Sequence, residues 1–515
     1  MKLDKAAMAE THSRAARLPL CLIASALLLR LLFFHPSSTD ESFSTQPRLV
    51  LRVQGQTPPL RPHSSYARYP MSDVPAYFVS NNSLGKSVIH RFFDSSPFSP
   101  SGRYIAATLL PSTTRGNANV VVYDLRAGGG PTTVASTSAW GAQVGAHVQW
   151  GADDTQLFYN SVGQEKQLIG KMFDVHIGRE RNLSCPVYHV SSDGRWAATP
   201  NQLRIKDTQF GYGADYYRRA PPEAFLSSAH GDGLFVLDVK RNECRLVVSL
   251  ASFAQAARLS ISSPSSAPLY GFHVKWSRDG TRLLFVMRTL DSRKVLLLAP
   301  PIRRQHLFVV SFDASSGAVV GKPRHLLSWS SKSPKDALDA NHPNWVANTH
   351  KMSINVKPRG SAAPWGLVVI DTASVSVDTL LLPPLYSPSS GHPNFHPTDS
   401  RFVLLDAYEK ESLSLGEKRS MNDSIPLRLV DTLQKREVWL LQVRLGLASP
   451  RPAYFATLPL KERRAWQRCD MHPAWSRRGD WVAFNGRPDG VVRQLLVAYV
   501  GDSPDTLFPL AASSV

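Results

Sequence analysis

The sequence predicts an all-β protein: a seven-bladed β-propeller of four-stranded blades, preceded by an N-terminal membrane anchor and stem. Three observations predict this fold. One short motif recurs seven times, each copy is followed by a further strand-like apolar segment, and no long helical pattern lies between the copies. Such repetition is typical of a propeller, in which every unit folds as one blade around a central channel.

Each copy of the motif has the same parts in the same order. A short strand ends in a bulky apolar anchor residue, a short polar turn follows, and the next strand alternates apolar and polar residues. The turn often contains Asp-Gly or Ser-Gly, and glycine supplies the positive φ that tight hairpins require. The seven anchors are Phe98, Trp150, Val190, Trp276, Trp345, Phe395 and Trp475.

A third strand follows each motif after a variable gap. These strands are expected at residues 120–125, 168–175, 234–239, 307–312, 367–372, 438–443 and 495–500. A minimal four-stranded blade takes about 40 residues. The longer units are therefore expected to carry loop insertions, near residues 200–232, 251–268, 290–305 and 410–435. We assign residues 76–515 to the propeller.

The residues before the propeller indicate a membrane anchor. Residues 18–34 are apolar except for Arg30, and basic residues precede them. Positive charge on that side favours a cytoplasmic N-terminus, although the segment is at the short end for spanning a bilayer. We predict a cytoplasmic tail at residues 1–17, a signal-anchor transmembrane helix at 18–34 and a Ser/Pro-rich stem at 35–75. We therefore predict a single-pass type II membrane protein of the secretory pathway (ER or Golgi), with the propeller in the lumen.

A cleaved signal peptide, and hence a secreted protein, is the alternative, because the length also suits the apolar region of a signal sequence. Three glycosylation sequons, at Asn81, Asn182 and Asn422, agree with either location. Cys185 and Cys244 are a candidate disulfide. The cysteines form no CxxC motif, so metal binding by cysteine is not expected.

The charge of the chain favours an anionic partner. It carries 59 Lys+Arg against 40 Asp+Glu, a net charge of +19. Such a balance suits an acidic glycan or an acidic protein. The basic residues are scattered and form no recognisable nucleic-acid module, which excludes nucleic acid as the expected partner. No sequence feature indicates an oligomeric state.

Two resemblances add to this interpretation. The pattern of HPAWSRRGDWVAFNG followed by LLVAYV, residues 472–500, resembles the TolB-like (WD40-like) propeller repeat, which implies the fold. The segments VSSDGRWAATPNQLRI, GHPNFHPTDSRFVLLDAY and RCDMHPAWSRRGDWVAFNG resemble propellers placed beside the oligogalacturonate lyase group. That resemblance implies a polysaccharide lyase that uses a bound divalent metal and histidine ligands.

Histidine recurs at one phase of the motif, three residues before the anchor. The five positions are His147, His273, His342, His392 and His472. In a propeller this phase lies at the start of the innermost strand, so the five side chains are expected around one mouth of the channel. They are either copied scaffold that bonds neighbouring backbone, a metal or acid–base site, or a pH-sensitive or ligand-binding surface.

The metal interpretation selects three of these histidines. Neutral imidazole is a common ligand, and a catalytic metal needs about three protein ligands and an open position. His342, His392 and His472 come from adjacent blades 5, 6 and 7, which makes them candidate ligands of one divalent ion, Mn, Zn or Ca. Asp470 and Gln467 supply oxygen atoms at the same mouth.

The lyase resemblance implies catalytic roles for other residues near this mouth. His273 or His147 is a candidate base, and Tyr408 is a candidate proton donor. Arg468 is a candidate cation for neutralising a substrate carboxylate. The aromatic insertion FGYGADYY, residues 210–217, either stacks on a sugar ring or packs across the propeller face.

Two functions are compatible with these residues. The sequence favours a non-catalytic interaction platform for acidic glycans or proteins, because a rigid propeller with long loops needs no special residue geometry for that role. The alternative is a metal-dependent lyase-like enzyme acting on uronate-containing glycans. No GxSxG, P-loop or HExxH motif is present. An enzyme should show histidines converging to ligand distance, whereas a platform should show each one bonded to backbone.

Overall fold

The computed structural model describes thirteen segments of the chain. They are residues 74–80, 85–112, 116–127, 130–209, 211–214, 229–259, 269–290, 302–330, 338–358, 365–381, 390–408, 424–446 and 460–508. The predicted tail, the anchor and nearly all of the stem lie outside these residues. Within the described segments, no helix has the length and apolar character needed to cross a membrane.

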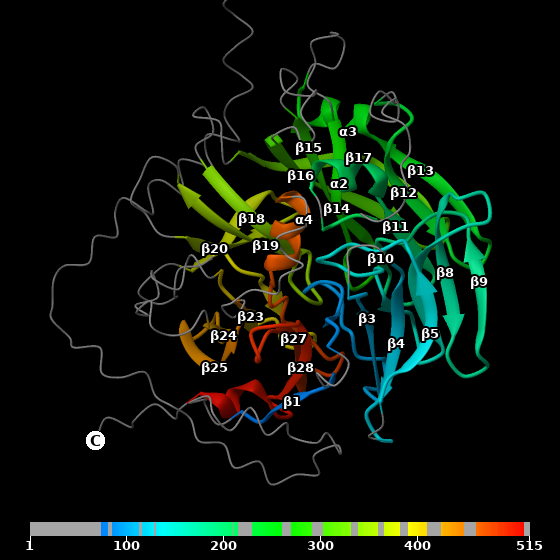
Figure 1. Ribbon diagram of the computed structural model, residues 1–515. Coiled ribbons are helices and arrows are strands. Elements are labelled where there is room, and N and C mark those ends of the chain that lie inside the picture. The colour runs from blue at the N-terminus through cyan, green and yellow to red at the C-terminus, as the bar shows by residue number, and fades with distance from the viewer. Residues whose placement is uncertain are drawn as a thin grey trace, which may run out of the picture.

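The described segments form seven antiparallel sheets of four strands each, arranged as a ring (Figure 1). The predicted seven-bladed propeller is confirmed. Blades 1 to 3 contain β2 (Val88–Ile89), β3 (Tyr104–Leu109), β4 (Ala118–Asp124) and β5 (Thr132–Thr137); β6 (Gln149–Trp150), β7 (Gln156–Val162), β8 (Leu168–Asp174) and β9 (Arg179–Leu183); and β10 (His189–Val190), β11 (Trp196–Thr199), β12 (Gly233–Asp238) and β13 (Glu243–Ser249).

Blades 4 to 6 continue the ring in chain order. They contain β14 (Leu269–Trp276), β15 (Arg282–Leu290), β16 (Ile302–Asp313) and β17 (Ala318–Trp329); β18 (Leu338–Trp345), β19 (Lys351–Pro358), β20 (Gly366–Asp371) and β21 (Ser376–Leu381); and β22 (Asn394–Phe395), β23 (Phe402–Leu405), β24 (Ser424–Asp431) and β25 (Arg436–Arg444).

The seventh blade joins the two ends of the propeller. Its three inner strands are β26 (Ala474–Trp475), β27 (Trp481–Gly486) and β28 (Gln494–Tyr499). Its outer strand is β1 (Ala76–Phe78), which pairs antiparallel with β28. The start of the propeller thus hydrogen-bonds its end, which closes the ring and leaves no unpaired gap between the first and last blades.

Three of the four anchor tryptophans connect adjacent blades through a hydrogen bond. Trp150 Nε1 donates to Pro97 O at 2.8 Å, Trp345 Nε1 to Lys275 O at 3.0 Å, and Trp475 Nε1 to Asn394 O at 2.9 Å. In each case the acceptor carbonyl lies one residue before the anchor of the preceding blade. A buried indole needs a partner for its N–H, and the repeat supplies one at the same position for these three anchors, whereas Nε1 of the fourth, Trp276, lacks a partner among the described atoms. The recurrence of tryptophan at the anchor thus has a structural cause.

Replacing Trp345 by Phe tests this contact. The variant keeps an aromatic ring but leaves Lys275 O without its indole donor, which we expect to lower the free energy of unfolding by about 1–3 kcal/mol. Urea unfolding measures the loss as a lower midpoint at unchanged slope. The matched control is Trp439→Phe, whose Nε1 bonds the Glu437 side chain on the outer strand of blade 6. Equal losses in both variants would contradict an inter-blade role.

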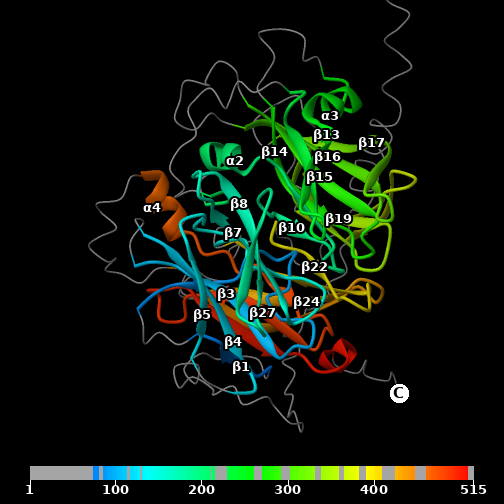
Figure 2. The ribbon, with the colours of Figure 1, turned by 90° about the vertical axis from the view of Figure 1, so that its right-hand side faces the viewer.

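Within the part of the chain that the structure describes, helices are few and short, as expected. They are α2 (Gln202–Thr208), α3 (Leu250–Ala256), α4 (Leu460–Gln467) and the 3-10 helix η7 (Pro504–Leu507). In both ribbon views α2 and α4 lie on the same side of the ring (Figure 2). Gln143 Nε2, which follows blade 1, donates to Ala465 O in α4 at 2.6 Å. These two helices therefore cover one mouth of the channel.

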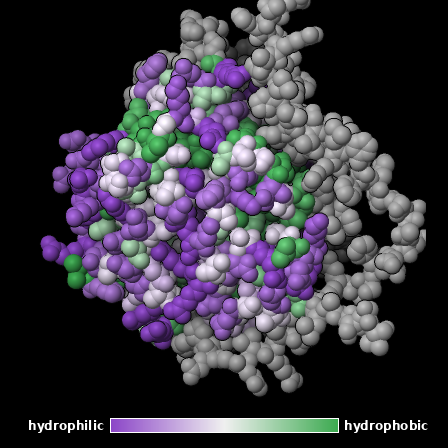
Figure 3. All heavy atoms as spheres, turned by 180° about the vertical axis from the view of Figure 1, so that it is seen from behind, coloured by the Kyte–Doolittle hydropathy of each residue, from purple (hydrophilic) through white to green (hydrophobic). Residues whose placement is uncertain are grey.

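The predicted disulfide is confirmed. Cys185 and Cys244 are bonded, with their Cα atoms 6.1 Å apart, and Cys469 is buried. The bridge ties the segment that enters blade 3 to the outer strand of that blade. Asn182 is exposed, whereas the sequons at Asn81 and Asn422 lie outside the described residues. The face seen from behind is mainly hydrophilic, with small apolar patches and no broad one over its described part (Figure 3).

Candidate metal centre and active site

Blade 1 departs from the repeat at the channel. Its innermost strand pairs with β3 through Val88 and Ile89, and pairing resumes only at an isolated bridge between Phe98 and Ile105. The intervening residues 90–97 leave the sheet and cross the channel. They place Phe92 and Phe93, both buried, among the histidines of the other blades. This crossing explains why the histidine phase fails at Ser95, because the strand that carries it is interrupted.

The five repeat histidines are all buried, but they divide into two groups. The ring centroids of His342 and His392 are 4.0 Å apart, and those of His392 and His472 are 4.5 Å apart. His273 instead stacks on Phe92 at 5.4 Å, and His147 packs against Tyr188 at 5.0 Å. The three predicted metal ligands therefore lie together, and the two candidate bases lie apart from them.

The backbone is strained at three of the five repeat histidines. His147, His342 and His472 have φ of 57°, 54° and 50°, in the left-handed region that few non-glycine residues occupy. His342 and His472 also precede a proline, which further restricts their backbone. The β18–β19 pairing also shifts register between Asn341 and Asn344, which makes a bulge around His342. Strain of about 1–3 kcal/mol per residue persists where the surroundings require a given side-chain direction.

His392, Asp470 and His472 form the group best suited to hold a metal. Each is buried, and each offers one ligand atom within 4.8 Å of the others. Among the described atoms, Nε2 of His392 and both ring nitrogens of His472 lack a hydrogen-bond partner. His472 Nε2 is 3.6 Å from Asp470 Oδ2, longer than a hydrogen bond. Unpartnered buried nitrogens cost about 1–3 kcal/mol each, a cost that coordination to a cation would remove.

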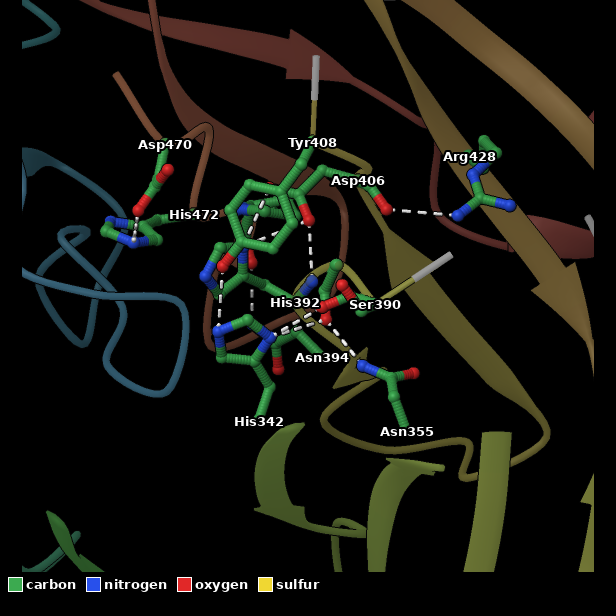
Figure 4. Close-up of polar contacts among 12 residues, drawn as sticks. His342, Asn355, Ser390, His392, Asn394, Asp406, Tyr408, Arg428, Asp470 and His472 are labelled. Carbon is green, nitrogen blue, oxygen red and sulfur yellow. Dashed lines mark hydrogen bonds and ion pairs between the residues drawn. The ribbon is translucent and has the colours of Figure 1, made fainter. Parts of the chain in front are cut away.

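Outer residues orient this group (Figure 4). His392 Nδ1 lies 2.9 and 3.0 Å from the two carboxylate oxygens of Asp406, which leaves Nε2 as the nitrogen available for a metal. Asp406 also accepts from the backbone N–H of His392. A carboxylate behind a ligating histidine fixes its tautomer and increases its basicity. On the other side, Arg468 Nε donates to Asp470 Oδ1 at 2.8 Å.

The electrostatics keep these groups in the forms that a metal requires. Burial holds the pKa of His392 well below its usual range, so the imidazole is neutral. Burial alone would raise the pKa of Asp470, but Arg468 and His472 hold it well below its usual range, so the carboxylate is charged. Burial raises the pKa of Asp406 to about 7. Two imidazoles and one carboxylate suit Mn or Zn better than Ca, which prefers oxygen ligands.

His342 lies beside this group but uses both of its nitrogens. Nδ1 donates to the backbone carbonyls of Ser390 at 2.8 Å and Gly391 at 2.9 Å. Because carbonyls only accept, Nε2 carries no proton and accepts from the Tyr408 hydroxyl at 3.0 Å. The structure thus brings two of the three predicted ligands together with Asp470, and pairs His342 with the predicted proton donor.

A cavity opens above the metal group on the side of α2 and α4. It encloses about 580 Å³ including its open mouth. Its lining includes His273, His342, Tyr408, Arg468 and the ring of Phe92. Arg468 Nη2 donates to the Tyr408 hydroxyl at 3.1 Å. Four sequence-predicted residues therefore meet at one cavity, while His147 does not line it.

Sequence reasoning missed Arg288, which lines the same cavity. It is buried, donates to the side-chain oxygens of Gln305 and Gln209, and lies over the ring of Phe272. Within the described segments it contacts no carboxylate, whereas Arg468 pairs with Asp470. Arg288 is thus an uncompensated cation at the cavity wall. Its position on the second strand of blade 4, outside the repeat motif, gave no signal in the sequence.

Tyr212 and His90 are further neighbours of the metal group. Tyr212, from the aromatic insertion, donates to Asp470 Oδ2 at 3.2 Å and lines the cavity. The insertion therefore packs across the channel mouth at this residue. His90 lies 6.4 Å from His472 between ring centroids, and burial lowers its pKa to about 3. His90 does not lie three residues before the anchor of blade 1, so the repeat motif did not identify it.

Comparison with known proteins agrees with the fold. No family model and no curated protein sequence matches the chain. An oligogalacturonate lyase from Vibrio parahaemolyticus is similar in structure, with TM-score 0.52 and 13% identity over 84% of this chain and 95% of that chain. An oligogalacturonate lyase in complex with manganese gives TM-score 0.52 and 12% identity over 83% and 93%. TolB from Acinetobacter baumannii gives 0.33 and 13% over 66% and 64%. The TM-scores of the two lyases, at such low identity, show a shared fold alone.

Proposed function

We propose that this chain is a metal-dependent polysaccharide lyase that cleaves uronate-containing glycans by β-elimination. One observation carries the proposal: the buried group of His392, Asp470 and His472, with its unpartnered nitrogens, lies below a cavity lined by acid–base residues and a free cation. The similar fold of a manganese-bound oligogalacturonate lyase supports it. The convergence of the histidines favours an enzyme over the non-catalytic platform that the sequence favoured.

Arg288 is the residue we assign to the substrate carboxylate. A guanidinium that has only neutral partners in a buried site is costly unless an anion completes it. Its planar fork binds a carboxylate through two parallel hydrogen bonds. The net charge of the chain, +19, also suits an anionic glycan. An uncharged sugar would leave the cation uncompensated.

His273 is the residue we assign as the base. It lines the cavity, and its Nδ1 is hydrogen-bonded to the Tyr188 hydroxyl. With Nδ1 protonated and donating to Tyr188, Nε2 is able to accept the proton of the carbon next to the carboxylate. Burial, with Lys275 and Arg288 nearby, holds the pKa of His273 well below its usual range, so the neutral form is available. His147, which does not line the cavity, is less suited to this role.

Tyr408 is the residue we assign as the proton donor. Burial raises the pKa of Tyr408 well above its usual range, so the phenol keeps its proton until the leaving oxygen needs it. As the carbon–oxygen bond breaks and the carbon–carbon double bond forms, Tyr408 protonates the leaving oxygen. Arg468, which already donates to the Tyr408 oxygen, stabilises the phenolate that remains. A bound divalent metal would supply Lewis-acid polarisation of the substrate carboxylate.

The metal content of the purified full chain tests this proposal. Elemental mass spectrometry without chelator is expected to find about one divalent ion per chain, which His472→Ala loses together with lyase activity on oligogalacturonate. Activity is followed by the ultraviolet absorbance of the new double bond conjugated with the carboxylate. The control is His176→Ala, an exposed residue on blade 2. A metal-free wild type, or a His472→Ala variant with full metal and activity, would overturn the proposal.

A further inference from the structure

The channel contains a second cavity at its opposite mouth. It encloses about 1020 Å³ including its open mouth, and it shares no lining residue with the cavity on the α2 and α4 side. Its walls include the anchor aromatics of five blades: Trp150, Trp276, Trp345, Phe395 and Trp475. Because each histidine lies three residues before its anchor, the inner strands run from one cavity to the other.

The crossing segment of blade 1 separates the two cavities. Phe92 lines the first cavity and Asp94 lines the second. The segment is fixed by an ion pair between Arg91 and Asp94, by Lys275 at 3.2 Å from Asp94, and by a hydrogen bond from the Asn394 side chain to Phe93 O. The side chains of both ion pairs are buried. A ligand in the second cavity is therefore held apart from the candidate metal centre.

Two arginines extend across the second mouth. Arg278, in the turn of blade 4, donates from Nη1 to Pro397 O of blade 6 at 2.5 Å. Arg477, in the turn of blade 7, donates from Nη2 to Gly151 O of blade 2 at 2.5 Å. Both line the cavity. Their hydrogen bonds go to backbone carbonyls, which leaves their positive charge uncompensated.

No carboxylate in the described segments forms an ion pair with either arginine. The aspartates nearest to Arg477, Asp153 and Asp154, accept hydrogen bonds from Thr155 and Ser101 instead. Burial lowers the pKa of Arg477, and the charge of Arg278 lowers it further, whereas Asp154 and Asp153 act in the opposite direction. An anion between them would relieve both the repulsion and the unpaired charge.

The floor of the cavity adds to the positive charge. Lys275 lines it and is buried, with Asp94 as its carboxylate partner. Arg91 shares that same carboxylate. Lys275 therefore shares its one carboxylate with a second cation, and Arg278 and Arg477 also line the cavity. Ser95, Ser96 and Ser192 line it as well, and their hydroxyl groups offer neutral donors.

We infer that this second mouth is an anion-binding site, distinct from the candidate metal centre, that takes a small ligand through a carboxylate or phosphate group held between Arg278 and Arg477. The site does not depend on the proposed lyase activity. Both arginines lie in the turn of the repeat motif, at the same motif position. Arg278 follows Ser277 in blade 4, and Arg477 follows Ser476 in blade 7. The ring thus places these two turns opposite each other across the channel, where one anion contacts both.

Isothermal titration calorimetry with inorganic phosphate and with glucuronate, on the full chain at fixed ionic strength, tests this site. Wild type is expected to bind at least one probe. Arg278→Gln is expected to weaken binding about tenfold, and combination with Arg477→Gln is expected to abolish it. Binding of phosphate alone indicates a phosphate ligand, and binding of glucuronate indicates a carboxylate ligand. Arg278 is exposed, so its single variant is expected to fold.

Two controls keep the result specific. Arg195→Gln removes an exposed arginine that lies over Trp196, outside the cavity lining, and should bind both probes as wild type does. His472→Ala should also retain binding, because its side chain lies on the other side of the crossing segment. Failure of wild type to bind either probe would overturn the inference. So would equal weakening in Arg195→Gln, or loss of binding in His472→Ala with retention in the double arginine variant.

Discussion

Replacing Tyr408 by Phe is expected to lower kcat for elimination by about 10²–10³-fold, the usual range for losing a positioned proton donor. The substitution removes only the hydroxyl that lies 3.0 Å from His342 Nε2 and 3.1 Å from Arg468 Nη2. The ring remains to pack against His392. Because no ligand of the metal group is touched, metal content should stay at the wild-type level. KM should change little, since the hydroxyl acts mainly as the bond to the leaving oxygen breaks.

The measurement combines steady-state kinetics on oligogalacturonate with elemental analysis of the same sample. Tyr499→Phe is the matched control, because its hydroxyl bonds Asp502 on the outer part of blade 7 and lines neither cavity. An unchanged kcat in Tyr408→Phe would remove Tyr408 from the reaction. A fall in kcat that parallels a fall in metal content would indicate that Tyr408 supports the metal group and does not donate the proton.

The fold was predictable because its signals are local. Strand alternation, turn glycines and anchor aromatics each extend over a few residues, and their repetition defined seven units. The turn of blade 4 illustrates this, since Gly280 has the positive φ of 69° that the motif required. The two features that were missed depend on distant partners. β1 finds its place only by pairing with β28, more than 400 residues away in sequence, and the crossing of residues 90–97 interrupts a strand that the motif made continuous.

The site was predictable only in part, for the same reason. The phase of the motif identified the histidines that reach the channel, and it correctly placed His342, His392 and His472 beside one another. The motif did not determine which ring nitrogens of these histidines lack a hydrogen-bond partner. That depends on Ser390, Gly391 and Asp406, which take up nitrogens of His342 and His392. The inclusion of Asp470 with His392 and His472 likewise follows from tertiary packing. The ligand and catalytic roles of all these residues stay predictions.

Lowering the pH from 7 to 5 is expected to reduce the free energy of unfolding by about 6 kcal/mol through three histidines that lie away from the metal group. Burial lowers the pKa of His189 to about 4, of His306 to about 3 and of His325 to about 4. Their pKa in the unfolded chain is about 6.5. Between these values the unfolded state binds more protons, so stability is present above about pH 6.5 and is lost as the pH falls. Each histidine contributes about 2 kcal/mol at pH 5.

The contacts explain why these three imidazoles resist protonation. His189 Nδ1 accepts from the backbone N–H of Trp276, so it has no place for a second proton. His306 and His325 share the hydroxyl of Ser328, and Arg304 adds a positive charge beside them. Denaturant unfolding at a series of pH values gives the slope. His306→Gln with His325→Gln should reduce that slope by about two protons between pH 6 and 5, whereas exposed His176→Gln with His350→Gln should leave it unchanged. A slope that the first pair does not alter would show that these two histidines bind as many protons in the folded chain as in the unfolded chain, which would contradict their lowered pKa.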